Sequence, residues 1–357
     1  MDLKTLREQI NRVDLEILKL IKERSEYVEN VGKVKHENSG KIYVPEREKQ
    51  IFEKLRENNA SKISSEAIIS IFTEIISACR SLEKPMTISF LGPESSYTHS
   101  AAVKQFGSSV QFQPEISIDE VFYNVEKGFS DFGVVPIENS TEGAVNYTLD
   151  KFMDSELKIV AEVEEKISHY LMSSCDSLDN VKKVYSHPQA IAQCKKWLAT
   201  RMKHAELIEV NSTSYAAQIA SENTDSAAIA SRLAAQKYNL NTLAESIEDC
   251  SSNTTRFLVI GKHINEKSGY DKTSIMFSPY EKVGSLYNSL KFFNEESINL
   301  SMIESRPNKK SPWKYIFFID FEGHFSDVKV QKALEGIKSV STEFKILGSY
   351  PTKECKK

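Results

Sequence analysis

Apolar residues recur every three or four positions through residues 3–34, and this spacing limits the possible folds more than any other feature of the chain. The pattern predicts one face of a helix of about nine turns. The positions that form it are Leu3, Leu6, Ile10, Val13, Ile17, Leu20, Val31 and Val34. Because so long a helix cannot bury this face alone, it must pack against other helices.

Two further helices are predicted before residue 85. Pro45 suits the first turn of a helix, where its missing N–H costs nothing. Ser64 or Ser65 can cap a third helix, and Pro85 ends the region. We therefore expect an all-α N-terminal domain of three helices.

From Thr87 to about Gly261 the pattern changes to short apolar runs, such as TISFL, FGVVPI and RFLVIG, that alternate with helical stretches. This alternation predicts an α/β domain with a largely parallel sheet. The polar stretch HINEKSGYDK is typical of a linker, and the segments after it follow the order βαββαβ of a ferredoxin-like fold. The expected fold class is thus multidomain: all-α, then α/β, then α+β.

Composition excludes several classes of protein. The formal net charge of −4 argues against a nucleic-acid binder. Five cysteines without a C-x-x-C pair argue against a disulfide framework or a zinc site. We expect no metal and no organic cofactor, because possible ligands do not cluster at metal-binding spacing. The charged start and the lack of an apolar run of about 18 residues predict a cytoplasmic protein without a membrane segment.

Cations lie on and beside the seam of the first helix. Arg24 occupies a seam position, Arg7 and Lys35 flank it, and Arg47 and Glu48 lie in the first turn of the second helix. A lone arginine near a seam is usually solvated. Several cations that face one bundle interior need anionic partners, so a bound anion is predicted.

The spacing of these cations adds a geometric constraint. Arg7 and Arg24 are roughly 25 Å apart along one helix, too far for one small metabolite. An antiparallel second copy would bring Arg7 of one chain near Arg24 and Lys35 of the other. We therefore predict an intertwined dimer with shared sites.

The stretch LREQINRVDLEILKLIKERSEYVENVGKVK, followed by PERE, resembles the all-helical chorismate mutase family. The resemblance implies that chorismate is bound by Arg7, Arg24, Lys35, Arg47, Glu48, Cys79 and Glu83. It also implies catalytic roles for Arg24, Lys35, Glu48 and Glu83. Two positions depart from the family, which often has Asp at Val44 and Gln at Glu83. Since Glu donates a hydrogen bond only when protonated, mutase efficiency should fall as the pH rises.

Polar loops follow the strands of the middle domain in FLGPESSYTHSAA, VVPIENSTEGAV and VYSHPQAIAQC. Ligands of open α/β sheets bind outside the carboxyl ends of the strands, and helix N-termini there favour anions. A single such loop is more often a helix cap, but three together predict a shared cleft.

These loops and NTTRFLVIG resemble the prephenate dehydratase family over about 175 residues. That implies two lobes, like those of periplasmic binding proteins, with the active site between them. The site residues that the resemblance implies are Asn139, Ser140, Thr141, Ser186, His187, Gln189, Gln193, Thr255, Arg256 and Phe257.

Thr255 is the residue that the resemblance ties most closely to dehydratase activity, because a hydroxyl can donate a hydrogen bond to the departing ring hydroxyl of prephenate. Arg256 could anchor a substrate carboxylate or form a structural ion pair, and both roles stay open. His187 could act as an acid, although a structural role is slightly favoured. Ser95 stands where the family usually has Gly, which restricts the backbone of the first loop.

The C-terminal segment resembles the ACT family of amino-acid-sensing domains. The motif ESRP and the glycine-containing turn before the first helix carry this resemblance. They imply binding of L-phenylalanine at Gly284, Ser285, Leu286, Glu304, Ser305, Arg306 and Pro307. Tyr287 replaces a smaller aliphatic residue beside this turn.

The order of the three matches is that of bifunctional P-proteins, in which a mutase precedes a dehydratase and a regulatory domain. We expect domains at residues 1–84, 86–262 and 272–353, conversion of chorismate to prephenate and then to phenylpyruvate, inhibition by L-phenylalanine, and a homodimer or homotetramer. Two alternatives stay open. One is a dehydratase with a non-catalytic or regulatory mutase-like domain, and the other is a metabolite-binding protein without catalysis.

Overall fold

The structure is a computed structural model that describes residues 2–37, 41, 43–308 and 314–352. The chain divides into two compact units. The first comprises residues 1–87 and 103–111, and the second comprises residues 88–102 and 112–357.

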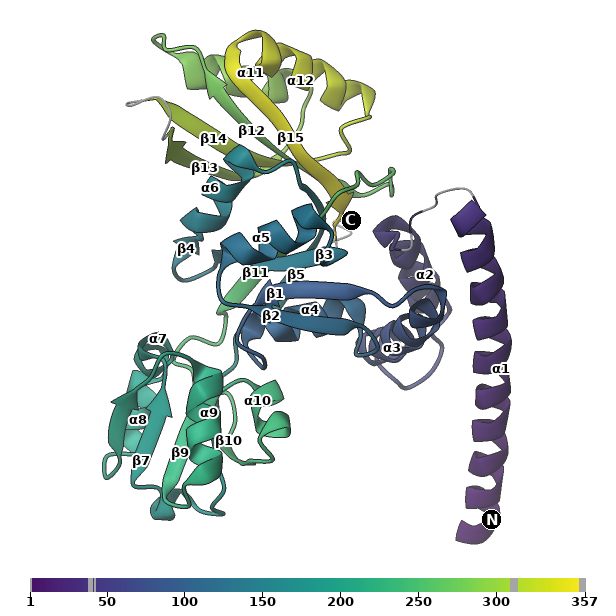
Figure 1. Cartoon of the computed structure of the whole chain (residues 1–357), viewed down its shortest axis with the longest axis vertical. Coiled ribbons are helices and arrows are strands. Elements are labelled where there is room, and N and C mark those ends of the chain that lie inside the picture. Colours follow the sequence, from purple (N-terminus) through teal and green to yellow (C-terminus); the bar gives the residue numbers. More distant parts are fainter. Residues whose placement is uncertain (1, 38–40, 42, 309–313, 353–357) are drawn as a thin grey trace. The chain divides into compact units, whose positions relative to one another are not determined.

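The first unit is built from three helices, as expected, drawn in purple and dark blue in Figure 1. They are α1 (Leu3–Glu37), α2 (Pro45–Asn58) and α3 (Ser65–Glu83). Pro45 opens α2, and the Ser64 hydroxyl caps α3 by accepting the N–H of Ala67 at 3.2 Å. Of the predicted interruption HENSGK, the first two residues belong to α1 and residues 38–40 lie outside the described residues.

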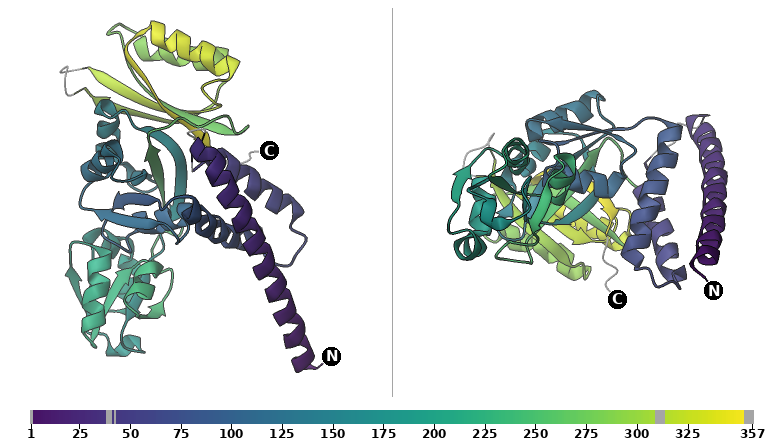
Figure 2. Two further views of the ribbon diagram at one scale, coloured as in Figure 1. Left: turned by 45° about the vertical axis from the view of Figure 1, so that its right-hand side comes forward. Right: turned by 90° about the horizontal axis from the view of Figure 1, so that it is seen from below.

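Helix α1 is a single uninterrupted rod, as Figure 2 shows from two further sides. It packs on α3, yet every residue of its apolar seam is between 44% and 65% exposed. The described residues of one chain therefore leave the apolar seam of α1 exposed, and the helix still needs the further packing partner that was predicted.

The second unit begins with a two-lobed α/β part. The first lobe has a sheet of order β2-β1-β3-β11-β5, with β4 paired to β3. Its strands are β1 (Thr87–Leu91), β2 (Gln111–Glu115), β3 (Phe132–Asn139), β4 (Gly143–Ala144), β5 (Lys158–Lys166) and β11 (Thr254–Gly261). Its helices are α4 (Tyr97–Phe106), α5 (Ile118–Lys127) and α6 (Asn146–Asp154).

The second lobe has a sheet of order β10-β6-β9-β7-β8. Its strands are β6 (Tyr170–Ser173), β7 (Lys183–Ser186), β8 (Glu206–Glu209), β9 (Ser226–Ala230) and β10 (Asn241–Ala244). Its helices are η1 (Leu178–Asn180), α7 (Pro188–Gln193), α8 (Lys195–Arg201), α9 (Thr213–Glu222) and α10 (Arg232–Lys237).

The prediction of a largely parallel sheet is wrong, because both sheets are mixed. Strand β1 is parallel to β3, and β7 is parallel to β8 and β9. Strand β11, however, is antiparallel to β3 and β5, and β6 is antiparallel to β9 and β10. The chain enters the second lobe after β5 and returns through β11, so the strands at the crossing oppose their neighbours.

The last part of the second unit has the predicted order βαββαβ. It comprises β12 (Asp271–Pro279), α11 (Ser285–Glu295), β13 (Leu300–Pro307), β14 (Tyr315–Glu322), α12 (Val328–Ser339) and β15 (Ser341–Pro351). The sheet order is β13-β14-β12-β15, and neighbouring strands are antiparallel throughout. Helices α11 and α12 cover one face of this sheet (Figure 1), where Phe277, Phe293 and Phe321 form the core.

The other face of this C-terminal sheet shares one hydrophobic core with the first lobe. Phe318, Leu347 and Tyr350 pack in one cluster with Ile137 and Leu258 of the first lobe. Strands β15 and β5 approach so closely that a Cβ on Gly348 would lie 2.1 Å from the carbonyl oxygen of Ile159.

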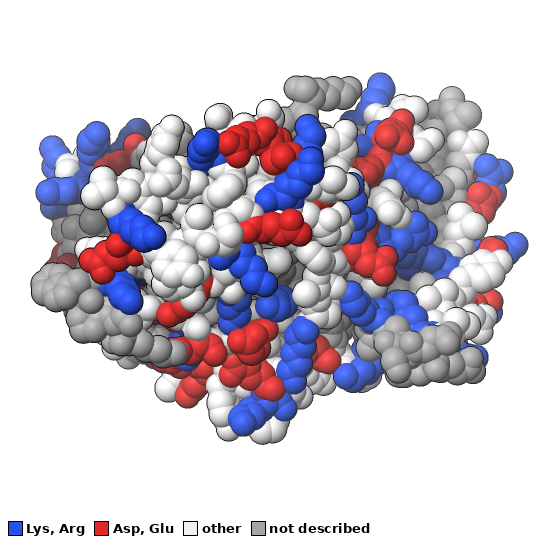
Figure 3. Space-filling view, turned by 90° about the horizontal axis from the view of Figure 1, so that it is seen from above, with Lys and Arg blue, Asp and Glu red and all other residues white. Residues whose placement is uncertain are grey.

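The segment predicted to be a linker is hydrogen-bonded to both sides of this shared core. The Asn265 amide donates to the carbonyls of Val160 and Ser349 at 2.7 and 3.1 Å. On the face shown in Figure 3, positive and negative side chains are interspersed. No described helix combines the length and the apolar character that a membrane crossing requires.

Candidate active sites

Four charged side chains meet at one end of the helical unit. Lys35 Nζ lies 3.3 Å from Glu83 Oε2, and Arg80 Nη2 lies 2.8 Å from Glu48 Oε1. The charge of Lys35 also acts on Glu48. The structure thus brings together Lys35, Glu48 and Glu83, three of the residues predicted for the mutase site.

Arg80 is a member of this cluster that the sequence analysis did not single out. Its guanidinium lies 5.2 Å from the ring centre of Tyr43, which is 1% exposed. Burial raises the pKa of Glu48, while Arg80 and Lys35 oppose this rise. Arg80 follows Ile76 by one helical turn, so a cation at a buried position of α3 was the available signal.

Arg24 is half-buried on α1, and its Nη1 atom is buried without a hydrogen-bond partner among the described residues. Such a donor favours an anionic ligand, because an unpaired buried charge is costly.

The other mutase residues lie elsewhere. Arg47 is exposed and donates to Gln50 at 3.2 Å, and Cys79 is buried in α3. Arg7 is exposed on the same straight helix as Lys35, 28 residues away, which corresponds to about 42 Å. One copy of the chain therefore does not bring Arg7 to the cluster.

In the two-lobed part, Thr255 at the start of β11 lies opposite Asn139 at the end of β3. Asn139 Oδ1 accepts the backbone N–H groups of Thr141 and Glu142 at 3.0 and 3.2 Å. Because backbone N–H groups only donate, these contacts fix the orientation of the Asn139 amide. Its Nδ2 then donates to Thr255 Oγ1 at 2.8 Å and to Asn253 Oδ1 at 2.9 Å. Thr255 Oγ1 is thus an acceptor, and its own proton is available to a ligand.

Side chains from the second lobe reach the loop after β3. Gln189 and Gln193 of α7 both donate to Glu142 Oε1, Gln193 at 3.3 Å. His187 is the N-cap of α7, where its Nδ1 accepts the N–H of Gln189 at 3.3 Å. Two of the three loops predicted to share a cleft therefore meet, and the placement of His187 supports its structural role.

Three other predicted residues use their side chains elsewhere. Ser140 Oγ accepts the N–H of Thr254 at 3.0 Å. The buried Ser186 hydroxyl donates to the carbonyl of Ile229 at 2.7 Å. Phe257 is 2% exposed. These side chains bond to the backbone or pack in the core rather than offering groups to a ligand.

Ser95, which replaces the expected glycine, has a φ of 64°, in the left-handed region. Its N–H donates to His99 Nδ1 at 3.0 Å, and its carbonyl accepts the Ser231 hydroxyl at 2.8 Å. The predicted restriction of this loop is therefore a real strain at a position held by contacts from both lobes.

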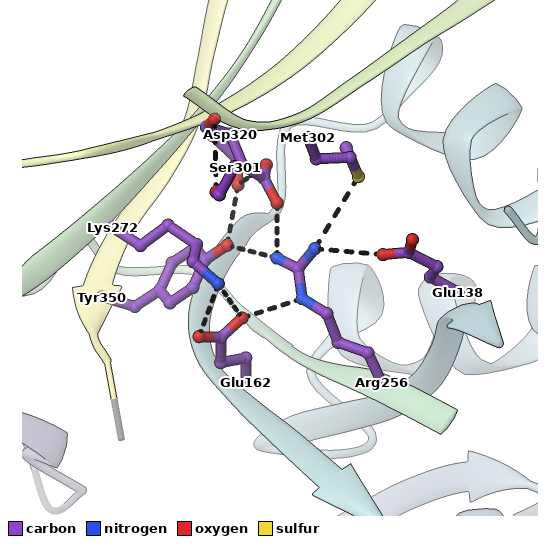
Figure 4. Close-up of polar contacts among 9 residues, drawn as sticks. Glu138, Glu162, Arg256, Lys272, Ser301, Met302, Asp320 and Tyr350 are labelled. Carbon is purple, nitrogen blue, oxygen red and sulfur yellow. Dashed lines mark hydrogen bonds and ion pairs between the residues drawn. The ribbon is translucent and has the colours of Figure 1, made fainter. Parts of the chain in front are cut away.

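Arg256 faces away from Thr255, because side chains alternate along a strand. Figure 4 shows its guanidinium among carboxylates, with Glu162 at 2.8 Å and Asp320 at 2.5 Å. The guanidinium also donates to the Tyr350 hydroxyl at 2.9 Å, and Lys272 neutralises Glu162 from the other side at 2.8 Å. Of the two roles left open for Arg256, this placement supports the ion pair and corrects its assignment to substrate binding.

The predicted effector residues lie on α11 and β13. Gly284 has a φ of 78° at the N-cap of α11, followed by Ser285 and Leu286 in the first turn. Glu304, Ser305, Arg306 and Pro307 lie on β13. Arg306 Nε and Nη2 donate to the two carboxylate oxygens of Asp150 on α6 at 2.9 and 3.2 Å. Arg306 of the ESRP motif thus forms an ion pair with a helix of the first lobe.

A helical unit with a cluster of two cations and two carboxylates, joined to a two-lobed α/β part with a threonine hydroxyl beside its loops, defines a multidomain enzyme. Residues 6–84 match the chorismate mutase type II family, and residues 88–265 match the prephenate dehydratase family. The chain belongs to the family of bifunctional chorismate mutase/prephenate dehydratases.

Two relatives and one solved structure support this family assignment. The bifunctional chorismate mutase/prephenate dehydratase of Aquifex aeolicus is 46% identical over 354 residues, which cover 98% of each chain. That of Pseudomonas aeruginosa is 42% identical over 98% of this chain and 97% of its own length. The crystal structure of prephenate dehydratase from Arthrobacter aurescens in complex with L-Phe superposes with a TM-score of 0.69. It is 33% identical and covers 74% of this chain and 90% of that one.

Proposed function

We propose that this chain rearranges chorismate to prephenate in its helical unit and converts prephenate to phenylpyruvate in its two-lobed part, as steps of phenylalanine biosynthesis. The observation that carries the second step is the hydrogen bond from Asn139 to Thr255. Prephenate loses CO2 and its ring hydroxyl as the ring becomes aromatic. The Thr255 O–H donates a hydrogen bond to that hydroxyl, which leaves with the C–O electron pair as hydroxide and takes a proton from solvent to become water.

The rearrangement of chorismate is pericyclic and needs neither a nucleophile nor a metal. A rigid site with charges placed around a dianion is sufficient to accelerate it. The buried, unpaired Nη1 of Arg24 and the cluster of Lys35, Glu48 and Glu83 support this assignment. The proposal includes three domains, at residues 1–84, 86–262 and 272–353.

The exposed seam of α1 supports an intertwined pair of chains. A second copy, antiparallel along α1, would cover the seam and supply Arg7 to the cluster around Lys35. Ile17→Glu places a charge on the seam, whereas Lys22→Glu places the same residue on the opposite face of α1. Light scattering should show loss of the dimer for Ile17→Glu alone, with loss of mutase activity. A strictly monomeric and fully active wild-type mutase at high dilution would contradict this pairing.

The C-terminal part is proposed to be an ACT domain that binds L-phenylalanine and inhibits the enzyme. The superposed dehydratase was crystallised with L-Phe, and the left-handed Gly284 lets the backbone approach a ligand. The Arg306–Asp150 pair would pass a change at β13 to α6. A homodimer or homotetramer and a cytoplasmic location remain predictions.

One experiment tests these assignments together. Purified protein is incubated with chorismate, and chorismate, prephenate and phenylpyruvate are followed over time with and without phenylalanine. Phenylpyruvate formed from chorismate alone and suppressed by phenylalanine is the expected result. Untouched chorismate with rapid conversion of added prephenate would favour a dehydratase with a non-catalytic mutase-like domain. No conversion of either substrate would favour a binding protein.

A further inference from the structure

A continuous series of polar contacts leads from Thr255 into the region between the two lobes. It passes through Asn139 and Asn253, then reaches Gln193 Oε1, which accepts from Asn253 Nδ2 at 3.3 Å. The same oxygen lies 2.8 Å from His169 Nε2, and His169 Nδ1 lies 2.9 Å from the Tyr97 hydroxyl. His169 is 2% exposed, and none of the assignments above gives it a role.

The backbone fixes the direction of the hydrogen bonds from Asn139 as far as His169 Nε2. The amide of Asn139 is fixed by the N–H groups of Thr141 and Glu142, so Asn253 Oδ1 must accept from Asn139. Asn253 Nδ2 must then donate to Gln193 Oε1. Because that oxygen only accepts, His169 Nε2 must carry a proton.

The other nitrogen of His169 follows from its environment. Burial lowers the pKa of His169, against the opposing effects of Gln193 and Glu248, so the ring is neutral near pH 7. A neutral ring protonated on Nε2 accepts on Nδ1, and the Tyr97 hydroxyl is the donor. Tyr97 Oη also lies 2.8 Å from the carbonyl oxygen of Ser168, so its proton is shared between two acceptors.

This arrangement decides which groups offer protons to a ligand. With Oε1 held by His169 and Asn253, Gln193 presents its NH2 group to the loop around Glu142, where Gln189 also donates. At the other end of the series, Thr255 accepts from Asn139 and keeps its O–H for a ligand. A reversed Gln193 amide would place its oxygen against the Glu142 carboxylate and its NH2 against that of Asn253.

We propose that His169 is a positioning residue of the dehydratase, which together with Asn253 holds the Gln193 amide in the orientation that makes Gln193, beside Thr255, a donor toward prephenate. The proposal rests on the proposed role of Thr255. His169 does not touch the substrate. It acts because its Nε2–H can only donate to Gln193, which excludes the reversed orientation.

The test is an isosteric pair, His169→Gln and His169→Glu. Gln places a donor near the position of Nε2, whereas an ionised Glu can only accept and would repel Gln193 Oε1. His169→Gln should keep dehydratase kcat/KM within about fivefold of wild type, while His169→Glu should lose about 100-fold at pH 8. The loss should shrink toward pH 5.5, because a protonated Glu donates again. A residue that only fills space would give equal values and flat pH profiles.

The groups around His169 determine the pH range in which a carboxyl at this position would titrate. The titratable groups that act on it are Tyr97 and Glu248, and Cys194 and Glu165 act on Tyr97 in turn. Burial and the charge of Glu248 would both raise the pKa of a carboxyl at position 169, which moves its titration into the assayed range.

Three controls separate the possible outcomes. His204→Glu makes the same change at an exposed histidine of the second lobe and should leave dehydratase activity unchanged. Mutase activity of each variant reports the amount of intact protein. If His169→Glu does not fold, His169→Asn, too short to reach Gln193, should lose about tenfold and replaces it.

Thr255→Val separates this inference from the proposed function. If Thr255→Val is inactive but His169→Gln and His169→Glu behave alike at all pH values, the role of His169 is overturned and that of Thr255 stands. If Thr255→Val is fully active, the role of Thr255 fails, and the positioning role fails with it.

Discussion

Single residues at both sites are held in states that their neighbours impose. Ser95 occupies a backbone region that favours glycine, Arg80 is buried beside Glu48, and the amide of Asn139 has only one possible orientation. In each case, burial or a hydrogen bond outweighs the intrinsic preference of the residue. These are the positions where a single substitution should have the clearest effect.

Substitutions at Ser95 should separate backbone strain from side-chain contacts. Glycine relieves the left-handed strain, whereas alanine keeps it, so Ser95→Gly should be more stable than Ser95→Ala by about 1 kcal/mol. Urea denaturation of both variants, followed by loss of dehydratase activity, measures the difference. Equal urea midpoints would show that the left-handed backbone at position 95 does not lower the free energy of unfolding, because the contacts to His99 and Ser231 compensate for it.

Arg80→Met should abolish most mutase activity, because Glu48 would remain largely buried without its nearest counter-charge. Removing one partner of a buried ion pair costs about 3–5 kcal/mol, so a loss of mutase kcat/KM of at least about 100-fold is expected. Dehydratase activity of the same protein and the exposed Arg56→Met variant serve as controls. Near-normal mutase activity in Arg80→Met would remove Arg80 from the site.

Motif-bearing residues were predictable at this scale, whereas their supporting residues were not. Thr255, Asn139 and Gln193 lie in long motifs, and the structure brings them into one hydrogen-bonded series. His169 lies outside these motifs, so no local pattern marks it, and Arg80 is marked only by its place one helical turn after Ile76. Their roles arise from contacts between segments far apart in the sequence.

At the scale of elements, strand β11 contributes both to the candidate dehydratase site and to the contact with the C-terminal sheet. Thr255 faces the loops of the two lobes, and the next residue, Arg256, faces the C-terminal sheet. Helices and turns were predictable because their periods and caps are local, as with Pro45 and Ser64. Strand direction was not, because it depends on where the chain returns from the second lobe.

Arg256→Met should destabilise the second unit by about 3–5 kcal/mol, because Asp320 would stay buried without its counter-charge. Adding Asp320→Leu should recover part of this loss, since an apolar pair replaces the ion pair. Urea denaturation of the wild type, both single variants and the double variant measures the coupling. Additive effects would mean that the two side chains stabilise the unit independently.

At the scale of the whole molecule, one buried and one partly buried histidine, His169 and His99, make the second unit sensitive to acid. Burial is the main cause that lowers the pKa of both His99 and His169. In the unfolded chain both would titrate near pH 6.5, so below this pH the unfolded chain binds more protons than the folded one. Stability is therefore complete above about pH 6.5 and is lost as the pH falls toward the folded pKa values.

The measurement is the urea midpoint for loss of dehydratase activity at pH 7.5 and pH 5.5. The wild type should have the lower midpoint at pH 5.5. The double variant His99→Gln/His169→Gln should show a smaller difference between the two pH values. An unchanged difference would place the acid sensitivity in other groups.

The shared core of Phe318, Leu347 and Tyr350 with Ile137 and Leu258 also bears on how the protein can be dissected. Cutting the chain between β11 and β12 would not release two finished domains, because each fragment would expose an apolar sheet face that the other now covers. A C-terminal βαββαβ part joined in this way cannot be transplanted by sequence boundaries alone, and a dehydratase trimmed of it would need a new surface before it stayed in solution.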